Sequence, residues 1–153
     1  MAGAARRLDL TVETWELAVC QLAAAADVPG WAIRGAFHAV VRSPGELTVV
    51  CDAALVPAGV RAQEGWRCIS LPGPIAFTET GIVAAIAVPL AAAGIGLFVI
   101  STFDTDYVLV AGAHFSAPEA AAQTPRLSNG RLENHSVSAG LATDLPALAA
   151  NLT

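Results

Sequence analysis

The sequence has no lysine, and charged residues of all kinds make up only 14% of its 153 residues, against about 25% in an ordinary soluble domain. The eight basic residues are therefore all arginines, and they are scattered along the chain. With a net charge of −5, the chain lacks the clustered basic side chains that bind phosphates, which argues against a nucleic-acid partner. So little charge also indicates that a partner covers part of the surface.

Metal-binding and secretory features are missing as well. The three cysteines, Cys20, Cys51 and Cys68, each lie in an apolar run, and no CxxC or Cys/His spacing is present. We therefore expect buried thiols, no metal site and no cofactor. The N-terminal residues contain no continuous apolar stretch of the kind that a secretory signal has, so we expect a cytoplasmic protein.

The longest uncharged run, residues 81–100, has the length of a membrane span. Three features argue against that interpretation. Much of the run is alanine, which partitions weakly into lipid, and Pro89, Gly94 and Gly96 interrupt it. After Gly94, the sequence "IGLFVIS" is rich in strand formers. We predict a helix, a glycine stop and a strand, with no membrane partner.

A strand-helix-strand-strand pattern occurs twice, about 60 residues apart. In the first half the elements are predicted at residues 15–22, 29–34, 36–42 and 47–51. In the second half they are predicted at residues 66–71, 80–93, 96–101 and 106–110, with Thr80 as the helix N-cap. In such a crossover the start of the helix and the end of the following strand lie at the same edge of the sheet.

This edge brings Gly81, at the start of the predicted helix, close to the polar turn "STFDTD" of residues 101–106. A helix N-terminus attracts a carboxylate or phosphate, and glycine allows close approach to its backbone. Asp104 and Asp106 can receive a cation, and Thr102 adds a hydroxyl group. The helix N-terminus and the acidic turn together match the carboxylate and the ammonium group of an amino acid. The alternative is that Asp104 and Thr102 only cap an ordinary hairpin.

The motifs "GWRC", "TGI", "PLAAAGI" and "ISTFDTDYVLV" in residues 65–110 resemble those of small bacterial tandem ACT-domain proteins. They are also similar to the ACT modules of the cytosolic arginine sensors and of aspartate kinase regulatory domains. The first half fits through "VPGWAIRGAFHAVVRSPGELTVVC". The resemblance implies an α+β fold of two ferredoxin-like βαββαβ (ACT-like) modules in tandem, with antiparallel sheets and helices on one face.

The resemblance also implies a ligand site. The helix start corresponds to Gly81 and Ile82, and the Thr-Phe-x-x-Asp turn to Thr102, Phe103 and Asp106. With the neighbouring polar residues, the predicted ligand-binding set is Thr80, Gly81, Ile82, Thr102, Phe103, Asp104 and Asp106. Because the sensors supply two facing modules from one long chain, we expect a homodimer here, with the pocket at or near its interface.

The predicted domains are an N-terminal ACT-like module at residues 10–64, a C-terminal one at 65–112 and a divergent or partly disordered tail at 113–153. In the tail, Pro118, Pro125 and Asn129-Gly130 interrupt any long helix, apart from a short one at 145–150. The last helix and strand of the second module are therefore uncertain.

Three classes of function remain to be compared. The leading hypothesis is a non-catalytic small-molecule sensor that binds an amino acid. The alternative is a structural or interaction domain that dimerises without a functional pocket. An enzyme is the least favoured class, because we find no catalytic residues: no nucleophile triad, no phosphate loop and no metal cluster.

Overall fold

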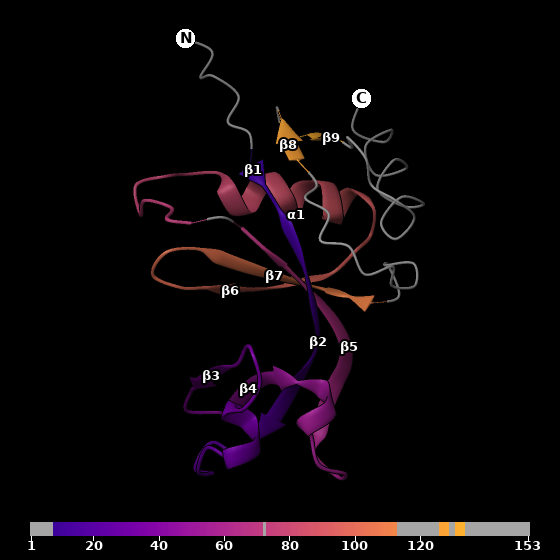
Figure 1. Ribbon diagram of the computed structural model, residues 1–153. Coiled ribbons are helices and arrows are strands. Elements are labelled where there is room, and N and C mark those ends of the chain that lie inside the picture. Colours follow the sequence, from indigo (N-terminus) through magenta and orange to yellow (C-terminus); the bar gives the residue numbers. More distant parts are fainter. Residues whose placement is uncertain (1–7, 72, 113–125, 129–130, 134–153) are drawn as a thin grey trace. The chain divides into compact units, whose positions relative to one another are not determined.

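The computed structural model describes residues 8–71, 73–112, 126–128 and 131–133 (Figure 1). They belong to two compact units. The first, called here the 14–68 unit, contains residues 14–68. The second, called the helix unit, contains the residues up to Glu13 and those from Ile69 onward. Two long strands, β2 (Thr11–Leu22) and β5 (Arg61–Ser70), contribute residues to both.

The 14–68 unit is built on strands in the order β3-β4-β2-β5. Strand β3 (Ala39–Arg42) and strand β4 (Leu47–Asp52) form an antiparallel hairpin, and β4 also pairs antiparallel with β2. The predicted helix at 29–34 is a single 3₁₀ turn, η1 (Gly30–Ile33), and a second 3₁₀ turn, η2 (Ala53–Leu55), follows β4. The buried cluster of this unit consists of Ala18, Cys20, Ala32, Leu47, Val49 and Cys51.

The helix unit has strands in the order β5-β7-β6, with helix α1 (Ile82–Ala92) between β5 and β6 in the chain. Strand β6 (Leu97–Ser101) pairs antiparallel with β7 (Asp106–Ala111). Helix α1 lies along these strands as a second layer (Figure 1). Its buried side chains share one cluster with alternate residues of β7: Ile86, Leu90, Val108 and Val110. Alternate strand residues point to one face, which explains this pairing.

The two predicted repeats have the same topology. In both, a strand is followed by a helix or helical turn, an outer strand and a returning strand, which lies between the other two. The structure thus confirms the α+β class, the antiparallel strands and the single helical layer on the sheet of the helix unit. That the halves are complete tandem modules, bounded at residues 64 and 65, stays a prediction.

The N-cap prediction at Thr80 was wrong. Helix α1 begins at Ile82, and its N-cap is Gly81, whose φ of 81° lies in the left-handed region. Glycine takes this conformation without the strain that a Cβ would cause, so it starts the helix with no side-chain cap. The predicted glycine stop is confirmed. Gly94 has a φ of 71°, and the amide of Ile95 donates to the carbonyl of Leu90 at 2.9 Å, as in a Schellman motif.

The uncharged run at 81–100 therefore divides into α1 and β6, as predicted. In the described part of the chain, no helix has the length and apolar character that a membrane span requires.

The tail contains two short strands that were not predicted. They are β8 (Arg126–Ser128) and β9 (Arg131–Glu133), which pair with each other. Strand β8 also pairs with β1 (Leu8–Asp9), giving a second sheet in the order β1-β8-β9. The helix predicted at 145–150 lies outside the described residues.

All three cysteines are buried and free, as expected. Cys20 on β2 and Cys51 on β4 hydrogen bond to each other through their side chains. Burial raises the pKa of both thiols, and that of Cys51 reaches about 12. The two groups are therefore neutral thiols at physiological pH. Among the described residues, no group of three or more His, Cys, Asp or Glu side chains is placed to hold a metal ion.

Candidate ligand pocket

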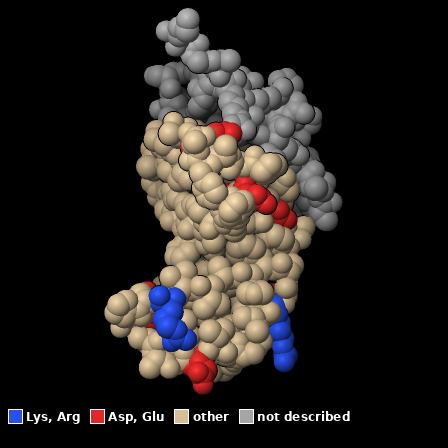
Figure 2. All heavy atoms as spheres, turned by 90° about the vertical axis from the view of Figure 1, so that its left-hand side faces the viewer, with Lys and Arg blue, Asp and Glu red and all other residues tan. Residues whose placement is uncertain are grey.

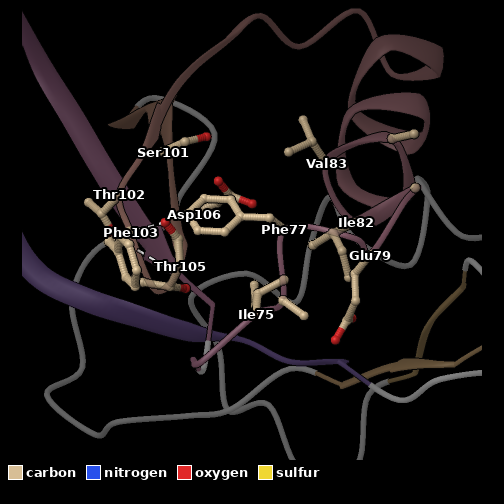
Figure 3. Close-up of a pocket in the computed structure, with 13 residues that line it drawn as sticks. Ile75, Phe77, Glu79, Ile82, Val83, Ser101, Thr102, Phe103, Thr105 and Asp106 are labelled. Atoms are coloured by element: carbon tan, nitrogen blue, oxygen red, sulfur yellow. Dashed lines mark hydrogen bonds between the residues drawn. The ribbon is translucent and has the colours of Figure 1, made fainter.

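A pocket of about 330 Å³ lies in the helix unit, between the start of α1 and the β6–β7 hairpin (Figure 3). One wall comes from the loop and first turn at residues 75–84, and the other from the hairpin at residues 101–106. The predicted edge of the sheet is thus the place where these two segments meet. The side chains that line it include Ile75, Phe77, Glu79, Ile82, Val83, Ser101, Thr102, Phe103, Thr105 and Asp106.

The hairpin is held by hydrogen bonds of its own. The hydroxyl and the amide of Thr102 both donate to the carbonyl oxygen of Thr105, at 2.9 and 2.7 Å. The amide of Thr105 donates back to the Thr102 hydroxyl oxygen at 3.2 Å. The Thr102 side chain therefore stabilises its own turn, as the alternative interpretation of this residue expected.

A second segment, formed by Leu71 and residues 73–75, is bound along the hairpin. The amide of Leu71 donates to the carbonyl of Asp106 at 3.1 Å, and the amide of Ile75 donates to the carbonyl of Asp104 at 2.7 Å. The hydroxyl of Thr105 donates to the carbonyl of Leu71. We call Leu71 and residues 73–75 the strap. Because the strap continues into the loop that lines the opposite wall, these bonds fix the two walls relative to each other.

Close approach of the strap to the hairpin requires glycine at position 73. A Cβ placed on Gly73 would lie 2.7 Å from the carbonyl oxygen of Asp104 and 3.4 Å from the Cβ of Thr105. The first distance is shorter than non-bonded atoms tolerate, and the obstacle is backbone rather than a movable side chain. Gly73 therefore permits the hydrogen bonds that build the pocket.

The N-terminus of α1 provides the donor end of the pocket. The first hydrogen bond of the helix runs from the amide of Ala85 to the carbonyl of Gly81 at 2.9 Å. The amides of the preceding helical residues therefore have no acceptor within the helix, and the helix dipole adds partial positive charge there. Gly81, Ile82, Val83 and Ala84 all line the pocket, and Gly81 has no side chain to block the backbone.

A carboxylate faces this donor end. Asp106, the first residue of β7, is half-buried, and its carboxylate points into the pocket beside the Ser101 hydroxyl (Figure 3). Glu79 also lines the pocket, but its carboxylate points away from that of Asp106 (Figure 3). Within the described lining no basic side chain is present. The negative charge that faces the helix amides across the pocket thus comes from Asp106.

Two aromatic rings stand at the rim. Phe77 from the loop and Phe103 from the hairpin lie with ring centroids 5.2 Å apart and planes at 87°, an edge-to-face contact. Their exposed fractions are 77% and 79%, the largest of any bulky apolar side chain in the described residues. The rings therefore join the two walls while leaving most of their own surface in water.

Five of the seven predicted site residues line the pocket: Gly81, Ile82, Thr102, Phe103 and Asp106. Thr80 and Asp104 do not. Asp104 contributes its backbone carbonyl to the strap instead. The sequence interpretation missed the loop part of the first wall, residues 75–79, including Phe77 and Glu79. In the motif "PIAFTETGI" a Phe and an acid precede the helix start, but the sequence alone does not show that this loop lies against the hairpin.

Comparison with known proteins agrees with this fold. The family model described as "ACT domain" matches residues 61–117, and a second model, for an N-terminal domain, matches residues 16–59. A solved structure of a protein from Agobacterium tumefaciens is 40% identical with a TM-score of 0.67, covering 71% of this chain and 81% of that one. Residues 61–117 thus match the ACT-domain family.

Among curated proteins, "Cytosolic arginine sensor for mTORC1 subunit 1" from Bos taurus is 41% identical over 83 residues, which cover 49% of this chain and 25% of the sensor. The chain thus matches only about a quarter of the length of that relative. A structure of aspartokinase alpha and beta subunits also matches, at 13% identity and a TM-score of 0.48, covering 69% of this chain and 88% of that one. The resemblance to the arginine sensors that was seen in the sequence is therefore confirmed.

Proposed function

We propose that this protein binds an amino acid in the pocket of the helix unit and acts as a non-catalytic sensor. The observation that carries the proposal is the opposition of two charged ends across one cavity. Helix amides at Ile82 and Val83 lie on one wall, and the Asp106 carboxylate lies on the other. An amino acid carries a carboxylate and an ammonium group on adjacent atoms, and it matches both ends at once.

In this arrangement the ligand carboxylate accepts hydrogen bonds from the first amides of α1. The ammonium group donates to Asp106, and Ser101 supplies a further hydroxyl. Gly81 lets the carboxylate reach the backbone, while Thr102 holds the hairpin turn. Of the seven residues predicted from the sequence, Thr80 and Asp104 then serve the pocket through the chain around them rather than through contact with the ligand.

The comparisons support a sensing role. The curated relative with 41% identity is named as an arginine sensor, and the matching family model is an ACT domain. Because this chain matches only 25% of that sensor, the particular amino acid and the process controlled do not follow from it. We extend from the comparison only the class of ligand and the absence of catalysis.

A homodimer completes the proposal. Little of the face in Figure 2 is charged, which favours cover of that face by a second copy. If the two halves are tandem ACT-like modules, a second copy supplies the facing modules that one longer chain supplies in the sensors. The protein is proposed to act in the cytoplasm, with neither nucleic acid nor membrane as a partner.

The second candidate is a structural or interaction domain that dimerises without binding a ligand. One observation favours it: the Thr102 hydroxyl is already engaged within its own hairpin, so the polar turn has a structural purpose without a ligand. A test must therefore separate ligand binding from fold stability.

A thermal-shift screen against the standard amino acids and common metabolites makes that separation. A ligand present at about 100 times its dissociation constant stabilises the protein by about 2.7 kcal/mol, which raises the melting temperature measurably. Stabilisation by one or a few amino acids supports the sensor. No shift with any compound at millimolar concentration refutes it and favours the interaction domain.

Asp106→Ala tests the assigned carboxylate, and Asp27→Ala is the matched control. Asp27 is exposed and belongs to the 14–68 unit, outside the pocket. We expect Asp106→Ala to abolish the ligand-induced shift while leaving the melting temperature without ligand nearly unchanged. Asp27→Ala should respond like the wild type. If both variants respond equally, Asp106 does not hold the ligand.

A further inference from the structure

Phe77 is the feature of the pocket that the proposed function leaves without a purpose. It lies in the loop before α1, its ring is 77% exposed, and it belongs to none of the motifs on which the sequence interpretation rested. A single exposed apolar side chain is ordinary on a protein surface. Here, however, two exposed phenylalanines meet at the rim of one cavity, and such a patch indicates contact with something else.

Backbone hydrogen bonds on both sides of Phe77 fix the loop that carries its ring. On the N-terminal side, the amide of Ile75 is bonded to the carbonyl of Asp104 at 2.7 Å. On the C-terminal side, the amide of Glu79 donates to the carbonyl of Ala76 at 2.9 Å, which closes a turn around Phe77. These bonds hold the backbone on either side of Phe77, so the ring projects from a fixed loop.

The Phe77 ring points into the pocket. In Figure 3 the Phe77 side chain extends from the loop wall across the pocket toward Asp106 and the hairpin. Its partner, Phe103, comes from the opposite wall and meets it edge to face. A ligand whose ammonium group is at Asp106 then has its side chain near these rings, because both rings and Asp106 line the same pocket.

We propose that Phe77 is a specificity-determining residue, which together with Phe103 forms an aromatic wall for the side chain of the bound amino acid. The inference rests on the proposed function and names the part of the pocket that distinguishes one amino acid from another. The helix amides and Asp106 recognise groups that all amino acids share. The rings contact only those side chains that reach them, so they contribute to selectivity.

The competing occupant of the rings is a second copy of this chain. Cover by a second copy requires no ligand and predicts a change in oligomeric state when the ring is removed. Cover by a ligand predicts a change in affinity and in the order of preferred amino acids. The two occupants therefore give different results in one set of variants.

The test uses the full chain as wild type, Phe77→Ala, Phe77→Tyr and, as a matched control, Val88→Ala. Val88 is an exposed apolar residue of α1, at 61%, and it is absent from the pocket lining. Each protein is screened with the standard amino acids by thermal shift. The amino acid that stabilises the wild type most is then titrated by calorimetry, and size-exclusion chromatography with light scattering gives the mass.

We expect Phe77→Ala to bind that amino acid about tenfold more weakly, as loss of an aromatic contact predicts, and to change the order of amino acids in the screen. Phe77→Tyr, which keeps a ring, should bind within about twofold of the wild type. Val88→Ala should match the wild type. The melting temperature without ligand and the mass should remain the same in all four proteins.

Three results overturn the proposal. If Phe77→Ala binds as tightly as wild type, the ring does not contact the ligand, while the proposed function stands. If its affinity is unchanged and its mass falls, a second copy covers the ring. If no amino acid stabilises the wild type, both proposals fail together. If Phe77→Ala does not fold, Phe77→Leu replaces it in the test, because leucine keeps an apolar side chain without a ring. Phe77→Leu should bind the amino acid several-fold more weakly than the wild type. Wild-type affinity in Phe77→Leu refutes the proposal.

Discussion

Substitution of Gly73 by alanine tests how the pocket is built. The new Cβ would lie 2.7 Å from the carbonyl oxygen of Asp104 and 3.3 Å from its carbonyl carbon. Because both are backbone atoms of a hydrogen-bonded turn, they cannot rotate away. The strap must therefore move off the hairpin, which weakens the bonds from Leu71 to Asp106 and from Ile75 to Asp104.

The cost can be worked out from these contacts. A backbone hydrogen bond contributes about 1 kcal/mol net, and two are affected. Forcing an extra methyl group into a filled space costs about 1–3 kcal/mol when the surroundings adjust. Against this, alanine lowers the entropy of the unfolded chain, which stabilises the folded state by about 0.4–1 kcal/mol. We expect Gly73→Ala to lower the free energy of unfolding by about 2–4.5 kcal/mol.

Urea denaturation followed by far-ultraviolet circular dichroism measures this loss, and Gly96→Ala is the control. Gly96 lies in the same unit, between α1 and β6, and a Cβ placed there meets no atom within 4 Å. Its substitution should change stability by no more than about 1 kcal/mol. Equal midpoints for Gly73→Ala and Gly96→Ala would refute the argument, because the strap would then not lie against the hairpin as described.

Two further predictions concern stability. Gly94→Ala should destabilise the protein by about 1 kcal/mol in the same denaturation assay, because alanine is strained at the φ of 71° that ends α1; an unchanged midpoint would contradict the Schellman geometry. Stability should also fall from about pH 9 upward, because the thiol of Cys51 has its ordinary pKa of 9.0 in the unfolded chain but a pKa of about 12 in the folded protein. Between these values the unfolded state binds fewer protons, so alkali favours unfolding, and Cys51→Ala should show a smaller decline in melting temperature across that range.

The strands and the end of the helix were predictable because the deciding signal is local. Alternating apolar residues and β-branched side chains marked the β6–β7 hairpin to within a residue, and Gly94 ended the helix as a glycine C-cap does. The start of the helix was not predictable in the same way. Thr80 satisfies the N-cap preference, and only the left-handed φ of Gly81 decides against it. That angle depends on how the loop returns to the sheet.

The hairpin wall of the pocket and the helix start could be predicted, but residues 75–79 of the other wall could not. Thr102, Phe103 and Asp106 are close in the sequence and belong to one hairpin. Their proximity in the fold could therefore be predicted from the sequence. The strap has no periodic pattern, and its Gly and Pro residues indicate only an irregular loop. Its placement depends on two backbone hydrogen bonds to residues about 30 positions further along. No pattern of side chains encodes such contacts, and this is why Phe77 was missed.

The engaged hydroxyl of Thr102 bears on how the pocket binds its ligand. Hydrogen bonds within the turn, taken alone, favour a purely structural role for it. The same bonds, however, also fix the backbone of Asp106, which follows the turn directly. Thr105 adds a bond from its hydroxyl to the carbonyl of Leu71 and so joins turn and strap. The backbone at Asp106 is thus held in place by bonds within the protein. Because little ordering is then required on binding, a small molecule with few contacts can bind with useful affinity. The structural and the ligand-binding interpretations of the turn are therefore compatible: the turn serves the site by being rigid.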